Sequence, residues 1–229
     1  MSTTKPCVKI LKSSKNDQGM SKAKDNDVQR NPGGRPRKFN RDVALRQAMD
    51  TFWLKGYDGS SIADLTAAMN MNAPSLYATF GGKEGLYREA VDLYSSLEGV
   101  ATKNALEAPG TTREVIGTML KRGLEAFSAG PVPRGCMVMI GGSNISSDRP
   151  DLRLLIRERQ QLVLDAIRIR LKKAALENEL IASVDVDALT TLCGLILAGL
   201  AVQAREGFSP AQLLAAIDAF IRTLPIRNS

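Results

Sequence analysis

Residues 42–91 read DVALRQAMDTFWLKGYDGSSIADLTAAMNMNAPSLYATFGGKEGLYREAV, and they carry the clearest structural signals in the 229-residue chain. Apolar residues recur at helical spacing from the start of this stretch to Gly56, which predicts a first helix. Ser61 and Asp64 have the spacing of a capping box, in which each side chain pairs with the backbone N–H of the other residue. A second helix should therefore begin after Ser61 and run to about Met69.

A turn and a third helix follow within the same stretch. Asparagine tolerates the left-handed backbone conformation, so residues 70–72 (Asn-Met-Asn) predict a tight turn. Residues 73–80 predict a helix, in which Pro74 is acceptable because N–H groups of a first turn have no partner. Two short helices joined by a turn form a helix-turn-helix, which can place its second helix in the major groove of DNA. The same arrangement also occurs in helical proteins that do not bind DNA.

Beyond the third helix, the chain shows only further helical patterns and no alternating strand pattern, so the fold is predicted to be all-α. The apolar content of 44% is ample for a packed core. The predicted helices span residues 83–97, 112–128, 135–145, 150–178, 186–206 and 210–224.

Positive charge is concentrated at the N-terminal end. Residues 1–41 contain eleven lysines and arginines against three aspartates, so the rest of a chain with a net charge of +7 sums to −1. This asymmetry favours a polyanionic partner approached from the N-terminal side. Residues 1–33 have too few apolar residues to offset the entropy of ordering, which predicts a disordered basic tail, with Met20 as a second possible start.

Residues 31–39 read NPGGRPRKF and connect this tail to the first helix. Glycine and proline occur in any loop, so the segment can be a plain linker. Alternatively, Arg35 and Arg37 lie in an extended segment that is slim enough for a narrow minor groove, whose negative potential attracts arginine. We favour the second interpretation, because the segment directly precedes the predicted helix-turn-helix.

Histidine is absent, and the three cysteines lie at the scattered positions 7, 136 and 193. Without histidine there is no Ser-His-Asp or Cys-His pair and no histidine-ligated metal, so we expect no catalytic residue, no metal and no cofactor. The few cysteines indicate a reducing compartment, and we expect the protein in the cytoplasm. The longest apolar run, residues 188–202, is too short to span a bilayer, which predicts no membrane association.

The stretch 42–91 resembles the DNA-binding domain of the tetracycline-repressor (TetR/AcrR) family of bacterial transcriptional regulators. The resemblance rests on the aromatic-x-x-Gly-Tyr end of the first helix, the Ser-Leu-Tyr-x-x-Phe third helix and the Lys-Glu that follows. It implies double-stranded DNA as a partner. It also implies a helix-turn-helix domain with its basic arm over residues 34–85, and a larger helical domain for effector binding and dimerisation over residues 86–225.

The resemblance also implies roles for particular residues. Bases would be contacted by Ala73, Pro74, Ser75 and Ala78, with the amide of Asn72, and phosphates by Ser61, Tyr77, Thr79 and Lys83. Two positions depart from the family pattern, since Asn70 stands where the turn usually has glycine and Thr79 stands where many members have histidine. The base-facing side has no arginine, so specificity should depend on methyl contacts, the Asn72 amide and DNA shape.

The last two predicted helices are strongly apolar and are the candidates for a dimer interface. Such helices could form a four-helix interface with their symmetry mates, or they could simply pack inside one chain. A homodimer is favoured because a twofold pair of helix-turn-helix domains doubles the DNA footprint. The predicted interface residues are Leu192, Ile196, Leu197, Leu200, Leu213, Ile217 and Phe220.

The middle segment PVPRGCMVMIGGSN, residues 131–144, combines flexible and small residues. Such residues can line a cavity between helices, or they can pack without one. The candidate cavity residues are Cys136, Met137, Met139 and Ile140. The whole pattern predicts a repressor that binds a palindromic operator and is released by a small hydrophobic or amphipathic effector. The alternative is an effector-independent architectural or adaptor protein that binds DNA.

Overall fold

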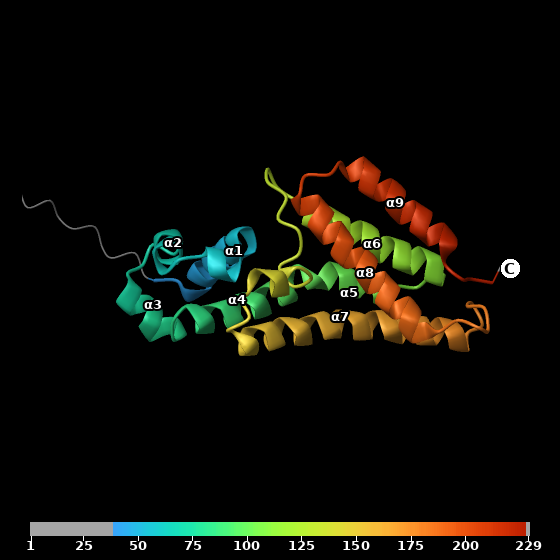
Figure 1. Ribbon diagram of the computed structural model, residues 1–229, viewed down its shortest axis with the longest axis horizontal. Coiled ribbons are helices and arrows are strands. Elements are labelled where there is room, and N and C mark those ends of the chain that lie inside the picture. The colour runs from blue at the N-terminus through green and yellow to red at the C-terminus, as the bar shows by residue number, and fades with distance from the viewer. Residues whose placement is uncertain (1–38, 228–229) are drawn as a thin grey trace, which may run out of the picture. The chain divides into compact units, whose positions relative to one another are not determined.

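The computed structural model describes residues 39–227, and this part of the chain is all-α, as predicted. Arg35 and Arg37 lie outside the described residues, as does the tail predicted over residues 1–33. Figure 1 shows the helices in chain order. Their bounds are α1 Arg41–Gly59, α2 Ile62–Ala68, α3 Ala73–Phe80, α4 Lys83–Leu97, α5 Gly99–Glu107, α6 Thr112–Phe127, the short 3-10 helix η1 Gly141–Asn144, α7 Pro150–Leu176, α8 Val186–Arg205 and α9 Pro210–Thr223.

Helix α1 is longer than predicted, because the chain kinks at Gly56 and then continues to Gly59. Gly56 has a φ of +74°, and a Cβ atom there would lie only 2.9 Å from the Cβ of Asn144. Glycine is therefore required both by the backbone conformation and by the close approach of the segment around η1. The kink places Tyr57 in the hydrophobic core, where it packs against Tyr87 of α4.

The helix-turn-helix of α2 and α3 forms from local signals. Ser61 caps α2 through the complete capping box with Asp64, as the spacing predicted. In the turn, Asn70 adopts a left-handed conformation with a φ of +50°, which confirms that asparagine can replace the usual glycine there. Helix α3 ends at Gly81, which is also left-handed, with a φ of +73°.

Helix α4 joins the first three helices to the rest of the chain (Figure 1). Its N-terminal half presents Tyr87 to Phe52 and Tyr57 of α1, with ring centroids 5.0 Å apart in both pairs. Two turns further on, Tyr94 packs edge to face on Trp53 at 4.8 Å. Edge-to-face aromatic pairs of this kind stabilise their contact by about 0.5–1.5 kcal/mol each beyond the area they bury. Helix α4 is therefore fixed to α1 along most of its length.

Helices α6 to α9 pack around a second part of the same hydrophobic core. Small residues allow close helix approach there, since a Cβ atom on Gly194 of α8 would lie 2.4 Å from the side chain of Leu164 on α7. Helix α8 is long and apolar enough to cross a bilayer by length and composition, but it packs against α6, α7 and α9 as a core helix does. Leu180, which follows α7, and Ile226, which follows α9, form a single antiparallel bridge.

Two sequence predictions about helices were wrong. Residues 135–145 do not form a helix but a loop that contains only the short η1. Gly135 has a φ of +68° there, and its α-carbon approaches the Ala201 carbonyl so closely that a Cβ atom would lie 2.5 Å from the oxygen. Helix α5 was missed: the predicted helix ends at Leu97, but Glu98 keeps a near-helical conformation and a further helix follows directly from Gly99.

Candidate nucleic-acid interface and internal cavity

Helix α3 has one buried face and one exposed face. Leu76 and Phe80 are buried in the core, and four-residue spacing places them on the same side of the helix. Pro74, Ser75 and Ala78 are exposed, as the base-facing assignment requires, whereas Ala73 and Thr79 are half-buried. Tyr77 is 56% exposed, which is unusual for so large a ring. The outward face of α3 thus offers small and polar side chains and one phenol.

The exposed phenol of Tyr77 is held in place from below. A Cβ atom on Gly82 would lie 3.1 Å from the ring, so the glycine leaves room for Tyr77 to rest on the backbone. Lys83 starts α4 beside it, and its Nζ lies 4.2 Å from the centroid of the Tyr57 ring. Partial burial lowers the pKa of Lys83. Its ammonium group is therefore engaged with an aromatic ring rather than fully extended into solvent.

Ser61 is less available for a phosphate than the sequence suggested. Its hydroxyl donates a hydrogen bond to the Asp64 carboxylate at 2.7 Å, and its backbone N–H donates to the same oxygen at 2.9 Å. Hydrogen bonds from Lys55 and Ser61 hold the pKa of Asp64 well below its usual range, so the carboxylate is charged. Both donors of Ser61 thus bond to a carboxylate in the free chain, and its contact with a phosphate stays a prediction.

Asn72 is the N-cap of α3, and its side-chain oxygen accepts a hydrogen bond from the Ser75 N–H at 2.8 Å. This contact fixes the direction of the amide group at the start of the helix. The oxygen is already used, so only the NH₂ end of the amide is open to a base.

Two of the four cations in residues 39–85 are ion-paired within the chain. Arg41 contacts Glu89 at 2.6 Å, and Lys55 contacts Asp64 at 2.6 Å. The same residues contain five aspartates and glutamates. The described part of the helix-turn-helix domain is therefore not itself a positively charged surface.

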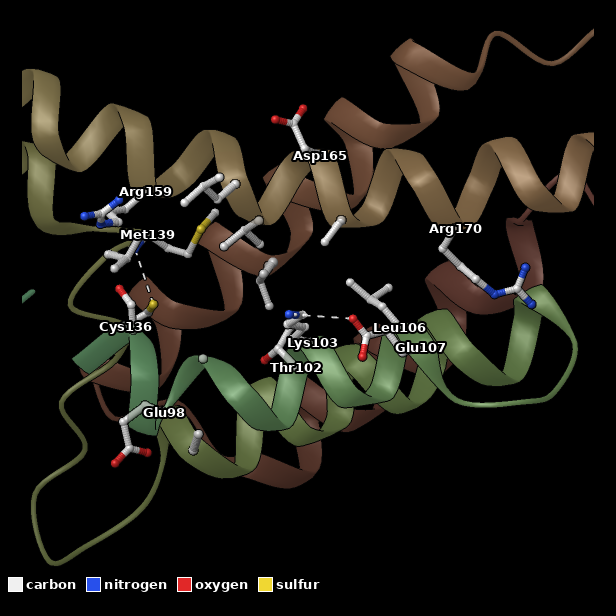
Figure 2. A pocket seen from close by; sticks show the side chains of 18 of the residues that line it. Glu98, Thr102, Lys103, Leu106, Glu107, Cys136, Met139, Arg159, Asp165 and Arg170 are labelled. Atoms are coloured by element: carbon white, nitrogen blue, oxygen red, sulfur yellow. Dashed lines mark hydrogen bonds and ion pairs between the residues drawn. The ribbon is translucent and has the colours of Figure 1, made fainter. Parts of the chain in front are cut away.

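A cavity of about 710 Å³ lies between α4, α5, α6 and α7, with Leu197 of α8 also in its wall, and Figure 2 shows its lining from close by. Of the four candidate cavity residues, Cys136 and Met139 line it, whereas Met137 and Ile140 line a much smaller hollow against Phe52 and Trp53. Sequence reasoning missed most of the wall. The missed residues include Tyr94 on α4, Leu106 on α5, Phe127 on α6 and Leu162, Ala166 and Ile169 on α7.

The segment before η1 connects this cavity to α1. The Trp53 indole N–H donates a hydrogen bond to the Gly135 carbonyl at 3.0 Å, and Cys136, the next residue, lines the cavity. The guanidinium of Arg134 lies 3.9 Å from the Trp53 ring centroid and also pairs with Asp50 at 2.6 Å. The cavity wall and the first helix of the helix-turn-helix domain are therefore in direct contact.

The residues predicted for a dimer interface divide into two groups. Leu197, Leu200, Leu213 and Ile217 are buried in the core of one chain, so they offer little surface to a partner. Leu192 is exposed, and Ile196 and Phe220 are half-buried. Leu195, Val202 and Leu214, which the sequence analysis did not select, are also exposed on α8 or α9.

Comparison with known proteins agrees with this architecture. Residues 44–90 match the family model described as "Bacterial regulatory proteins, tetR family". The HTH-type transcriptional repressor BdcR of Escherichia coli K12 is 30% identical over 186 residues, which cover 80% of this chain and 87% of BdcR. The chain belongs to the TetR family. The predicted resemblance to this family is thus confirmed.

Two further TetR-family relatives match most of the chain. The HTH-type transcriptional repressor ComR of Escherichia coli K12 is 29% identical over 195 residues, which cover 84% of this chain and 92% of ComR. The solved structure of a cysteine mutant of the TetR-family regulator CifR, complexed with 26-bp double-strand operator DNA, is 35% identical with a TM-score of 0.78. That match covers 84% of this chain and all of the CifR chain.

Proposed function

We propose that this TetR-family protein is a repressor that binds a palindromic operator in double-stranded DNA as a homodimer and releases it when a small hydrophobic or amphipathic molecule occupies the cavity. The observation that carries the proposal is the exposed outer face of α3, held on a helix whose other face is buried. The DNA in the CifR complex and the repressor names of BdcR and ComR support it. A bacterial regulator of this kind would act in the cytoplasm, where its DNA is.

In this proposal residues 34–85 form the DNA-binding domain and residues 86–225 the effector-binding and dimerisation domain. The division falls inside α4, so movement of this one helix would change the position of the DNA-binding domain relative to the cavity. A cavity of about 710 Å³ is within the size range of small-molecule sites. An architectural DNA-binding protein has no need of such a cavity, and this favours the effector-dependent function over that alternative.

Exposed apolar residues on α8 and α9 support the homodimer. Leu192, Leu195 and Val202 recur along α8 at spacings of three and seven residues, which places them on one side of the helix. Leu214 is exposed on the neighbouring α9. A row of exposed apolar side chains on two packed helices is typical of an interaction surface. We propose that this row meets its own symmetry mate.

The experiment that tests the proposed function is selection of genomic fragments by the purified protein, followed by sequencing. A repressor with two helix-turn-helix domains should recover sites with twofold symmetry, with half-site centres about 34–36 Å apart along the DNA. Recovery of fragments without a common sequence would instead indicate the architectural alternative.

Replacement of Tyr77 by phenylalanine is expected to weaken operator binding by about 3- to 10-fold, because it removes one hydrogen bond to a phosphate. The ring remains, so its packing on Gly82 and the helical content should not change. Lys83→Gln should weaken binding similarly, with a small loss of stability because the contact with Tyr57 is lost. Fluorescence anisotropy of labelled operator measures both effects, and unchanged affinity in both variants would remove these residues from the interface.

Operator affinity is expected to fall steeply with salt, by on the order of 1,000-fold between about 50 and 200 mM, because bound lysines and arginines release counterions from DNA. Titrations of one operator fragment at four salt concentrations measure the slope. A flat response would contradict a phosphate-binding surface.

A further inference from the structure

Most of the charged residues of the cavity already have an ion-pair partner within the chain. Seven line it, and six of them take part in ion pairs at 2.5 to 3.8 Å, some within the cavity wall and some with residues outside it. The seven are Glu98, Lys103, Glu107, Arg159, Asp165, Arg170 and Lys173. A charged ligand in this cavity would therefore be desolvated without meeting a free countercharge, which is costly.

Glu98 and Arg170 each have a charged group that is not fully paired, but neither group points into the cavity. Glu98 has no ion pair among the described residues, but Figure 2 shows its carboxylate turned away from the other labelled side chains. Arg170 has one terminal nitrogen without a hydrogen-bond partner, and that atom is covered by protein atoms. Its other terminal nitrogen donates to the Gly110 carbonyl at 2.8 Å, so the guanidinium is directed at the loop after α5.

One buried polar group in the wall of the cavity can exchange its hydrogen-bond partner. Tyr94 is 4% exposed, and its hydroxyl donates a hydrogen bond to the Cys136 sulfur at 3.4 Å. Burial raises the pKa of Tyr94 well above its usual value, so the hydroxyl keeps its proton. A thiol sulfur is a weak acceptor, and a ligand oxygen would accept the same proton more strongly.

We infer that the effector is an uncharged, largely apolar molecule with one hydrogen-bond-accepting oxygen, and that this oxygen replaces the Cys136 sulfur as the acceptor of the Tyr94 hydroxyl. This inference rests on the proposed function, in which the cavity is the effector site. Apolar wall residues such as Leu106, Phe127 and Val163 would surround the rest of the molecule.

Ligand binding at Tyr94 can be measured without DNA. Trp53 is the single tryptophan of the chain, and its ring lies 4.8 Å from that of Tyr94. It also donates a hydrogen bond to the carbonyl of Gly135, the residue before Cys136. A new partner for the Tyr94 hydroxyl will therefore change the surroundings of the indole, and its fluorescence reports occupancy.

Four probes with the same phenyl ring and four-carbon chain separate the possibilities: butyrophenone, butylbenzene, 4-phenylbutanoate and 4-phenylbutylammonium. Butyrophenone, which is neutral and has a carbonyl oxygen, is expected to bind about tenfold or more tightly than either charged probe. In Tyr94→Phe its affinity should fall by about 3- to 10-fold, whereas that of butylbenzene, which has no oxygen, should stay within about twofold. Tyr87→Phe is the matched control, because it removes a buried phenol of the same helix that does not line the cavity.

If 4-phenylbutanoate bound more tightly than butyrophenone, the inference would be overturned and Arg170 would be the anchor. If 4-phenylbutylammonium bound more tightly than butyrophenone, the inference would be overturned and Glu98 would be the anchor. Absence of a saturable fluorescence change with all four probes up to about 1 mM would also overturn it. Operator release is measured separately. If butyrophenone binds through Tyr94 but leaves DNA bound, the inference about the cavity holds and the proposed effector control fails.

Discussion

Leu195→Arg is expected to sediment as a monomer at micromolar concentration and to bind the full operator about 100- to 10,000-fold more weakly, because two linked half-site contacts become one. Leu195 is 64% exposed on α8, in the row with Leu192 and Val202. Arginine at this position is solvated in the monomer, so the fold should be retained. In the proposed dimer the same arginine would be buried against its symmetry mate without a partner, which opposes association. Analytical ultracentrifugation and operator titration measure the two effects.

Leu197→Arg is the informative control, although it lies only two residues away. Leu197 is 2% exposed, and one of its methyl groups would lie 3.0 Å from a Cβ atom on Gly123 of α6. Burying an unpaired arginine there should destabilise the monomer itself by about 3–5 kcal/mol, which is seen as a lower melting temperature. If Leu197→Arg gave a folded monomer and Leu195→Arg still formed a dimer, the row of Leu192, Leu195 and Val202 would not be the interface.

This pair of residues illustrates which parts of the structure the sequence could predict. Helix α8 is apolar around most of its circumference, so periodicity alone does not tell the buried side from the exposed side. The distinction depends on Gly123 and Leu164, which belong to α6 and α7 and approach α8 only in the folded chain. The existence of the helix was predictable from its own residues, whereas the orientation of its faces was not.

The helix-turn-helix was predicted closely because its determinants are local. The Ser61–Asp64 capping box, the left-handed Asn70 and the glycine at the end of α3 each act within a few residues of the chain. Such local interactions can be predicted from the amino-acid sequence. The same holds for the resemblance to the TetR family, which lay within residues 42–91.

The cavity was not predictable in this way. Its wall combines residues from α4, α5, α6 and α7, and the pairing of Tyr94 with Cys136 joins residues 42 positions apart. The segment that carries Cys136 was expected to be helical, but tertiary contacts decide its conformation. The Trp53–Gly135 hydrogen bond and the contact of Gly135 with Ala201 hold it as a loop.

The structure also changes the reasoning about charge at the DNA interface. Among the described residues of the DNA-binding domain, Arg41 and Lys55 are ion-paired and Lys83 lies over an aromatic ring. Phosphates attract a protein mainly through lysine and arginine, and most of the available ones lie in the N-terminal arm. Residues 1–37 alone contain nine lysines and arginines against three aspartates.

Deletion of residues 1–37 is therefore expected to weaken operator binding by on the order of 100-fold at low salt and to reduce the salt slope. If Arg35 and Arg37 enter the minor groove, the loss should be larger when A·T pairs flank each half-site, because such tracts narrow the groove and deepen its negative potential. The guanine amino group obstructs the floor of that groove, so G·C flanks should show a smaller loss. Titration of both proteins on operators with exchanged flanks measures the difference.

A matched pair of double variants separates groove binding from diffuse charge. Arg35→Ala with Arg37→Ala and Lys5→Ala with Lys9→Ala each remove two positive charges from the arm. Only the first pair is within six residues of Arg41, where α1 begins, so only its short tether restricts these side chains to the groove beside the helix-turn-helix. Discrimination between A·T and G·C flanks should therefore disappear in the arginine variant and persist in the lysine variant. Equal losses in the two variants on both kinds of flank would mean that the arm contributes charge alone, and the GRPR segment would then be a linker.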